Sequence, residues 1–275
     1  MVLDSSEIVK QLETQAPIEL GLEAEATSRR LLAGRAGWRE PRHAWLEATT
    51  DLHASYIRLL GSAPGLDLDQ ACRAVERMAA RGAWVEGLLT HDLAALGQDA
   101  PARLRGAGLQ RVGGSHAELF EAGERHWRGQ HDWSDSLAWL ERAASAGLRL
   151  QPALFYGEDE TAEQLASRLL DVRRLQERTG QVDGLSLVPH HARKAVETPG
   201  EISFGLDDMR LLATARLVLD NIRHVEVPWL AMGFKAGTMA LAFGADDLGP
   251  WCLDRSVTEG ARLATYLAVR EEEIG

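Results

Sequence analysis

The side chains best suited to chemistry in this sequence of 275 residues follow its predicted strands. Reactive groups of β/α barrels lie at the carboxyl ends of the strands, so these positions are the first place to look for a site. They carry histidine, carboxylate, glycine and aromatic residues: Asp51, His53, His91, Asp92, Gly113, Gly114, His116, Glu118, Tyr156, Glu158, Glu160, Pro189, His190, His191, Trp229, Asp246 and Asp247. Such a ring could bind a polar ligand or move protons near neutral pH.

A ring of this composition could also hold zinc or iron, since both metals bind histidine and carboxylate. However, no His-x-His pair follows the first predicted strand, and no lysine is placed to bridge two metals. The sequence therefore predicts no metal site. His91 and His190 could instead act as acid and base, although histidines in loops are commonly incidental. For Asp246 and Asp247 the turn chemistry of Asp favours a structural role.

Gly113 and Gly114 follow a predicted strand. Consecutive glycines let a ligand approach the backbone, and their N–H groups suit a carboxylate or a ribose. A tight turn into a helix that carries Glu118 on one face explains the same residues. Both interpretations stay open from the sequence alone.

Helical and strand patterns alternate along the chain, which is typical of a parallel sheet, open or closed. The predicted strands are 43–49, 83–89, 108–112, 148–155, 184–188 and 224–229. The predicted helices are 5–15, 20–33, 68–81, 102–106, 117–127, 133–146, 160–179, 206–219, 234–243 and 253–269. We predict one α/β domain over residues 1–275, a TIM-like (β/α) barrel with an N-terminal helical leader over residues 1–36.

The amino-acid composition limits the kinds of partner that we expect this protein to bind. The net charge is −11 and the pI is about 5.3, which argues against nucleic acid and against an anionic membrane. The first residues lack the apolar core of a signal peptide, and no long apolar run predicts a membrane span. We therefore expect a cytoplasmic protein.

Three segments in the second half resemble a known family. They are LFYGEDET (154–161), LLATARLVLDN (211–221) followed by HVEVPW (224–229), and MALAFGADDLG (239–249). They are similar to aminofutalosine synthase and cyclic dehypoxanthine futalosine synthase, the radical-SAM enzymes of the futalosine route to menaquinone, and to the deazaflavin-cofactor synthases. Residues 108–119 and 18–34 match more loosely.

The resemblance implies a radical-SAM barrel, in which a Cys-x3-Cys-x2-Cys loop after the first strand holds a [4Fe–4S] cluster. Here the corresponding stretch, TTDLHASY (49–56), has no cysteine, and the whole sequence has two, Cys72 and Cys252. We predict a degenerate member without the cluster. Between Ala83 and Gly108 there is room for one strand–helix pass where the family has about two. The barrel is therefore expected to be incomplete or open, with about one βα unit missing.

Three functions remain open. The protein could bind SAM or a related nucleoside, alone or with a catalytic partner protein, in menaquinone biosynthesis. It could be an enzyme of another class that uses the cavity for acid–base or metal-assisted chemistry on a nucleoside-like substrate. It could be a structural or regulatory subunit. A retained pocket would lie at the strand mouth, with Trp229 stacking on a base, and would bind phosphorylated ligands poorly. Its predicted ligand-binding residues are Gly113, Gly114, Glu118, Tyr156, Glu158, His190 and Trp229.

Overall fold

The computed structural model describes residues 3–32, 42–44, 56–59, 67–113, 133–157, 160–189, 205–227 and 234–248. The chain divides into two compact units. The first contains Met1–Trp38 and Leu150–Gly249, and the second contains Arg39–Arg149 and Pro250–Gly275. The expectation of a single domain over residues 1–275 stays a prediction.

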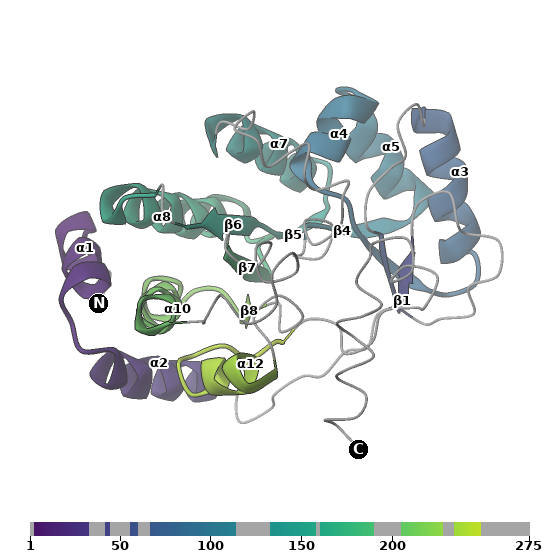
Figure 1. Cartoon of the computed structure of the whole chain (residues 1–275). Helices are drawn as coiled ribbons and strands as arrows, with labels where there is room; N and C mark the ends of the chain where they lie inside the picture. Colours follow the sequence, from purple (N-terminus) through teal and green to yellow (C-terminus); the bar gives the residue numbers. More distant parts are fainter. Residues whose placement is uncertain are drawn as a thin grey trace, which may run out of the picture. The chain divides into compact units, whose positions relative to one another are not determined.

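The first unit contains a sheet of three parallel strands, with its helices on one side of the strands (Figure 1). Its elements are α1 (Ser5–Glu13), α2 (Pro17–Leu32), β6 (Ala153–Tyr156), α8 (Ala162–Thr179), β7 (Gly184–Pro189), α10 (Leu206–Val218), β8 (His224–Glu226) and α12 (Phe234–Leu241). Helix α10 packs against α2, where Leu20 and Ala24 form a fully buried cluster with Ala213. Gly21 of α2 lies against the ring of Phe243, so these two segments approach closely because the glycine has no side chain.

The second unit contains the strands of the other sheet and its own helices (Figure 1). Its elements are β1 (Arg42–Ala44), β2 (Tyr56–Leu59), α3 (Leu68–Ala79), β3 (Trp84–Gly87), α4 (Thr90–Leu96), α5 (Ala100–Ala107), β4 (Leu109–Gly113) and α7 (Trp133–Ser145). A fifth strand, β5 (Arg149–Gln151), begins at the last residue of this part of the chain.

Local sequence explains where the helices begin and end. Asp67 caps α3 by accepting the N–H of Gln70 at 2.7 Å, and Thr161 caps α8 through the N–H of Gln164. Gly180 ends α8 in the left-handed conformation with φ +62°. Gly147 follows α7 with φ +80°. Helices α3 and α8 each connect two parallel strands, which is the arrangement expected of an α/β chain.

The strand order is β1-β2-β3-β4-β5 in one sheet and β6-β7-β8 in the other. Neighbouring strands whose register the structure describes run parallel, and they pair for example Arg58 with Glu86 and Ser186 with Glu226. The predicted α/β class is therefore confirmed. Among the described residues the strands form two sheets and not one closed ring, which agrees with the predicted incomplete or open barrel.

The predicted secondary structure was wrong in one segment and missed two short elements. The segment 148–155 was expected to be one strand, but it forms β5 and β6, which belong to different sheets on either side of Pro152. Proline has no N–H for a sheet ladder, so it is a natural point for the chain to leave one sheet. Strand β2 and helix α4 were not predicted, because each is short: four and seven residues.

Within the described ranges, no helix combines the length and the apolar character that crossing a membrane requires. The expected cytoplasmic location stays a prediction.

Candidate functional site: polar rows in the middle of the strands

A row of charged side chains crosses three neighbouring strands of the second unit. Arg58 of β2 lies opposite Glu86 of β3, and Glu86 lies opposite Arg111 of β4. All three are almost completely buried, with side-chain exposures of 4%, 0% and 7%. Charged residues are seldom fully buried unless they are paired, so this row is the most unusual feature of the sheet.

The alternation of each strand places the row on one face. Arg58 and Glu86 are flanked in the sequence by Ile57 and Val85, which pair with each other and are 1% and 0% exposed. Successive side chains of a strand point to opposite faces. Helices α3 and α5 contact β3 and β4. Because apolar strand faces pack beneath helices in α/β proteins, the polar row occupies the other face.

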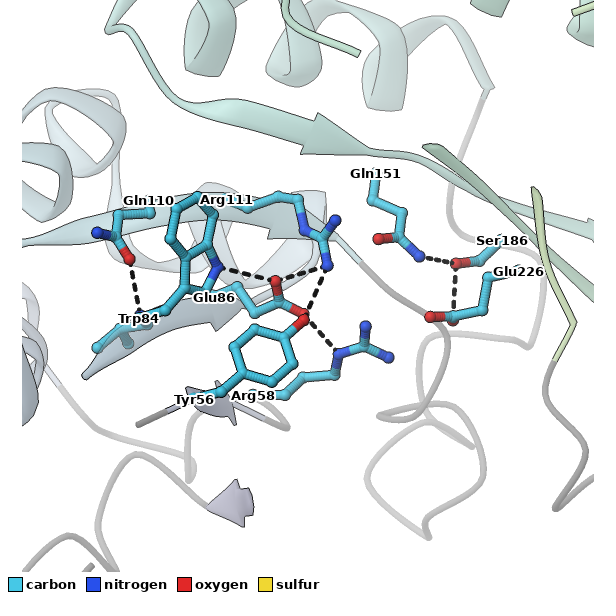
Figure 2. A network of polar contacts seen from close by, with 10 residues as sticks. Tyr56, Arg58, Trp84, Glu86, Gln110, Arg111, Gln151, Ser186 and Glu226 are labelled. Carbon is cyan, nitrogen blue, oxygen red and sulfur yellow. Dashed lines mark hydrogen bonds and ion pairs between the residues drawn. The ribbon is translucent and has the colours of Figure 1, made fainter. Parts of the chain in front are cut away.

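Glu86 is the centre of the row, and Figure 2 shows the donors that converge on it. Its Oε1 accepts the Nε–H of Arg58 at 2.8 Å. Its Oε2 lies 2.6 Å from Nη2 of Arg111 and accepts the indole N–H of Trp84 at 3.1 Å. Arg111 also donates from Nη2 to the hydroxyl of Tyr56 at 3.0 Å. Both oxygens of the carboxylate are thus engaged by protein donors.

The surroundings of Glu86 and Tyr56 fix the charge states of these two side chains. Burial alone would raise the pKa of Glu86, but Arg111 and Arg58 beside it lower the pKa from 4.5 to about 2. Burial raises the pKa of Tyr56, so its phenol stays protonated. Glu86 is therefore no proton donor near neutral pH, and Tyr56 is no base. The row can stabilise and orient an anion, but it has no group that exchanges protons there.

The row lies close to the carboxyl ends of its strands, which end at Leu59, Gly87 and Gly113. Gly87 has φ +109°, and a Cβ at this position would collide with the backbone of Leu59. Leu88 follows with φ +62°, an uncommon conformation for a side chain other than glycine. Tight, left-handed backbone thus ends β3 directly after Glu86.

Gly113, one of the predicted ligand-binding residues, ends β4 with φ +106°. Its N–H donates to the carbonyl of Leu88 at 2.9 Å. That N–H is therefore used within the protein, which favours the tight-turn interpretation for Gly113 over direct ligand binding through its own N–H. Nearby His91 lies in α4 with Nε2 3.4 Å from Asp92, whose carboxylate caps the helix by accepting the N–H of Leu89.

A second polar row joins β5 to two strands of the three-stranded sheet and is also drawn in Figure 2. Gln151 of β5 donates from Nε2 to Ser186 Oγ of β7 at 2.8 Å, and Ser186 donates to Glu226 Oε1 of β8 at 2.9 Å. The three residues are 0–1% exposed. A buried carboxylate is costly without hydrogen bonds, and this chain of donors offsets part of the cost.

Tyr156, the second predicted residue that the structure describes, ends β6. It is in register with Pro189, while Ala153 is in register with Ser186, so Tyr156 lies on the sheet face opposite Ser186. Its side chain is buried, and burial together with a hydrogen bond to Asp208 of α10 raises its pKa well above the ordinary value. The hydroxyl of Tyr156 is therefore engaged by helix α10, and its role in ligand binding stays a prediction.

Asp246 has a structural position, as its sequence context favoured. Its Oδ1 accepts Nη2 of Arg216 at 2.6 Å and the N–H of Val225 at 2.7 Å, and its Oδ2 lies 2.6 Å from Nδ1 of His224. Arg216 is completely buried and also donates from Nε to the carbonyl of Gly244 at 2.8 Å. These contacts hold residues 244–247 alongside β8, where Asp247 forms a parallel bridge with Glu226.

The remaining predicted ligand-binding residues, Gly114, Glu118, Glu158, His190 and Trp229, lie outside the described residues. Among the residues that the structure describes, no three His, Cys, Asp or Glu side chains gather as metal ligands would.

The sequence did not lead to either polar row, because reactive side chains were expected at the carboxyl ends of the strands and not within them. The signal was nevertheless present. Arg58, Glu86 and Arg111 interrupt short strands whose alternate residues are apolar, and a charge in the middle of a buried strand needs a partner. What the sequence lacked was the register that makes these residues partners of one another.

Comparison with solved structures defines the class of fold. The structure matches the crystal structure of methylornithine synthase (PylB) with a TM-score of 0.63, covering 98% of this chain and 94% of that chain at 10% identity. That identity is low, so the match shows the fold alone. The chain thus has a fold of the TIM-barrel type, with the described strands in an incomplete barrel.

Sequence comparison then gives the relatives. The chain is 27% identical over 183 residues to 5-amino-6-(D-ribitylamino)uracil–L-tyrosine 4-hydroxyphenyl transferase of Methanococcoides burtonii. This match covers 62% of this chain and 51% of that protein. It is 27% identical over 167 residues to aminodeoxyfutalosine synthase of Streptomyces coelicolor, covering 56% and 43%. Cyclic dehypoxanthine futalosine synthase of the same organism is 28% identical over 179 residues, covering 60% and 42%.

These matches confirm the resemblance that the sequence motifs indicated: the chain is related to the radical-SAM enzymes of the futalosine pathway. No family model matches the chain. The matched regions amount to about half the length of the relatives, so the activity, substrate and partners of this protein are matters for proposal.

Proposed function

We propose that this chain is a degenerate radical-SAM-related protein that builds no [4Fe–4S] cluster of its own. We propose further that it serves menaquinone biosynthesis by binding SAM or a related nucleoside, or by assisting a catalytic partner protein. The observation that carries this proposal is the supply of thiolates. Three cysteines must coordinate such a cluster, and this chain contains two, Cys72 and Cys252.

The environment of Cys72 supports the proposal. Cys72 lies within helix α3 and is 7% exposed. Burial raises the pKa of its thiol, and a buried thiol with a raised pKa is a poor metal ligand, since the thiolate is the form that binds. The segment 49–56, which corresponds to the cluster loop of the family, contains no cysteine. The residues present therefore do not fit the cluster, and no reaction step is assigned to it.

Anaerobic reconstitution tests this proposal directly. The protein is incubated with iron and sulfide, and aminodeoxyfutalosine synthase of Streptomyces coelicolor, treated in parallel, is the positive control. We expect substoichiometric iron, no cluster absorption and no 5′-deoxyadenosine from SAM. A full cluster with SAM cleavage would show that the protein is an active radical-SAM enzyme.

Ligand binding is measured separately by calorimetry with SAM, S-adenosylhomocysteine, adenosine and futalosine-type nucleosides. Saturable binding that weakens in Glu118→Ala or Glu158→Ala supports a working pocket. A failure of all four to bind would favour a structural or regulatory subunit. Binding accompanied by conversion of a nucleoside would instead favour an enzyme of another class.

A further inference from the structure

The guanidinium of Arg111 is only partly used by the protein. Its hydrogen bonds and its ion pair run through one nitrogen, Nη2, to Tyr56 and Glu86. Within the part of the chain that the structure describes, its Nε is buried and has no hydrogen-bond partner. A buried donor without a partner destabilises a folded protein, so such groups need an explanation.

We propose that Arg111 anchors a carboxylate-binding subsite on the polar face of strands β2, β3 and β4, with its free Nε–H as the donor that the ligand accepts. Arginine presents several donors in a planar fork, and a carboxylate is the anion whose flat geometry matches that fork. The hydrogen bonds to Glu86 and Tyr56 fix the orientation of the guanidinium before a ligand arrives. A donor held in place in this way loses little freedom on binding.

The position of Arg111 also suits a ligand. It stands two residues before Gly113, where β4 ends, and Glu86 stands one residue before the end of β3. Ligands of α/β folds approach from the carboxyl ends of the strands. The half-buried side chains of Tyr56 and Trp84 pair in register on the same face. They supply flat apolar surface beside the charged row.

The charges favour a monoanion over phosphate. Glu86 keeps its negative charge because its pKa is about 2, and it lies 2.6 Å from the same guanidinium that the ligand would use. A dianionic phosphate next to this carboxylate would be repelled more strongly than a carboxylate with a single charge. The subsite is independent of the proposed nucleoside binding, because it requires only a carboxylate.

The test observes the Arg111 Nε–H itself. In 15N-labelled protein, its side-chain resonance is assigned by its loss in Arg111→Lys, a variant that retains a cation for Glu86. Sodium acetate is the probe, with acetamide as the neutral control and phosphate as the competing anion. We expect acetate to shift the resonance saturably and acetamide to leave it unchanged. Phosphate should bind at least about tenfold more weakly.

Backbone amide shifts, including that of Gly113, then report acetate affinity in the variants. Arg111→Lys should weaken acetate binding about tenfold or more, because a charge-assisted hydrogen bond to the fork is lost. Arg105→Lys is the matched control, since Arg105 is an arginine of the same unit that binds the carbonyl of Gly147. It should leave acetate affinity unchanged.

Three results would overturn the proposal. The first is an Nε–H resonance that acetate does not move at any concentration. The second is phosphate binding as tightly as acetate, and the third is equal acetate affinity in Arg111→Lys and wild type. If Arg111→Lys fails to fold, the Nε–H resonance is assigned in the wild-type protein by through-bond NMR experiments. Its response to acetate then decides whether Arg111 binds the carboxylate.

Discussion

Glu86→Gln removes the only carboxylate of the charged row while keeping the size of the side chain. Arg58 and Arg111 then lose the anion that they share, inside a sheet where all three side chains are at most 7% exposed. Removing one partner of a buried ion pair costs about 3–5 kcal/mol because the other charge stays buried. The lowered pKa of Glu86 gives a similar free-energy cost for losing its charge. A fall from 4.5 to about 2 corresponds to about 3 kcal/mol at neutral pH.

The pH dependence separates this mechanism from a simple loss of packing. The folded pKa of Glu86 lies below its ordinary value, so its stabilisation is complete above about pH 5 and is lost as the pH falls from 4.5 toward 2. Glu86→Gln lacks this contribution. The difference in unfolding free energy between wild type and variant should therefore shrink by roughly 2 kcal/mol between pH 6 and pH 3.

The assay is urea unfolding followed by circular dichroism at a series of pH values. The control is Glu25→Gln, which breaks an exposed pair with Arg29 whose side chains are 34% and 74% exposed. This change should cost less than about 0.5 kcal/mol. The reasoning is refuted if Glu86→Gln costs no more than the control at pH 7, or if the difference from wild type is the same at pH 6 and pH 3.

Two further predictions concern the backbone and the second buried ion pair. Asp246→Asn should lower the unfolding free energy by about 3–5 kcal/mol in urea, because Arg216, which is 0% exposed, loses its anion; a loss below about 1 kcal/mol would contradict this. Gly87→Ala should lower the melting temperature far more than Gly97→Ala. Both glycines have positive φ, but only the Cβ at Gly87 meets backbone, that of Leu59, whereas nothing lies within 4 Å at Gly97. The expected costs are about 2–4 and about 1 kcal/mol, and equal costs would argue against the close approach of β2 and β3.

The charged row bears on the proposed function. Arg58, Glu86 and Arg111 place permanently charged groups near the carboxyl ends of three strands. Such groups are suited to holding a ligand in place and unsuited to exchanging protons at neutral pH. This arrangement agrees with the proposal of a binding or accessory protein.

Prediction from the sequence succeeded where local signals act. The cap at Thr161, the glycine at 180 and the helical periodicity between them define α8 without any tertiary contact. It failed where a short element depends on its neighbours. Strand β2 has only four residues and is recognisable as a strand through its pairing with β1 and β3. The split at Pro152 likewise depends on which sheet each half joins.

By itself, the sequence determined the alternation of strands and helices, the resemblance to the futalosine-pathway enzymes and the number of cysteines, because each is a property of residue types and their order. Only the tertiary structure decided that Arg58, Glu86 and Arg111 form one row, since parallel register joins residues 28 and 25 positions apart in pairs that no local pattern encodes. It also decided that Arg111 has a buried Nε with no partner among the described residues, because hydrogen-bond satisfaction depends on the packing around each atom.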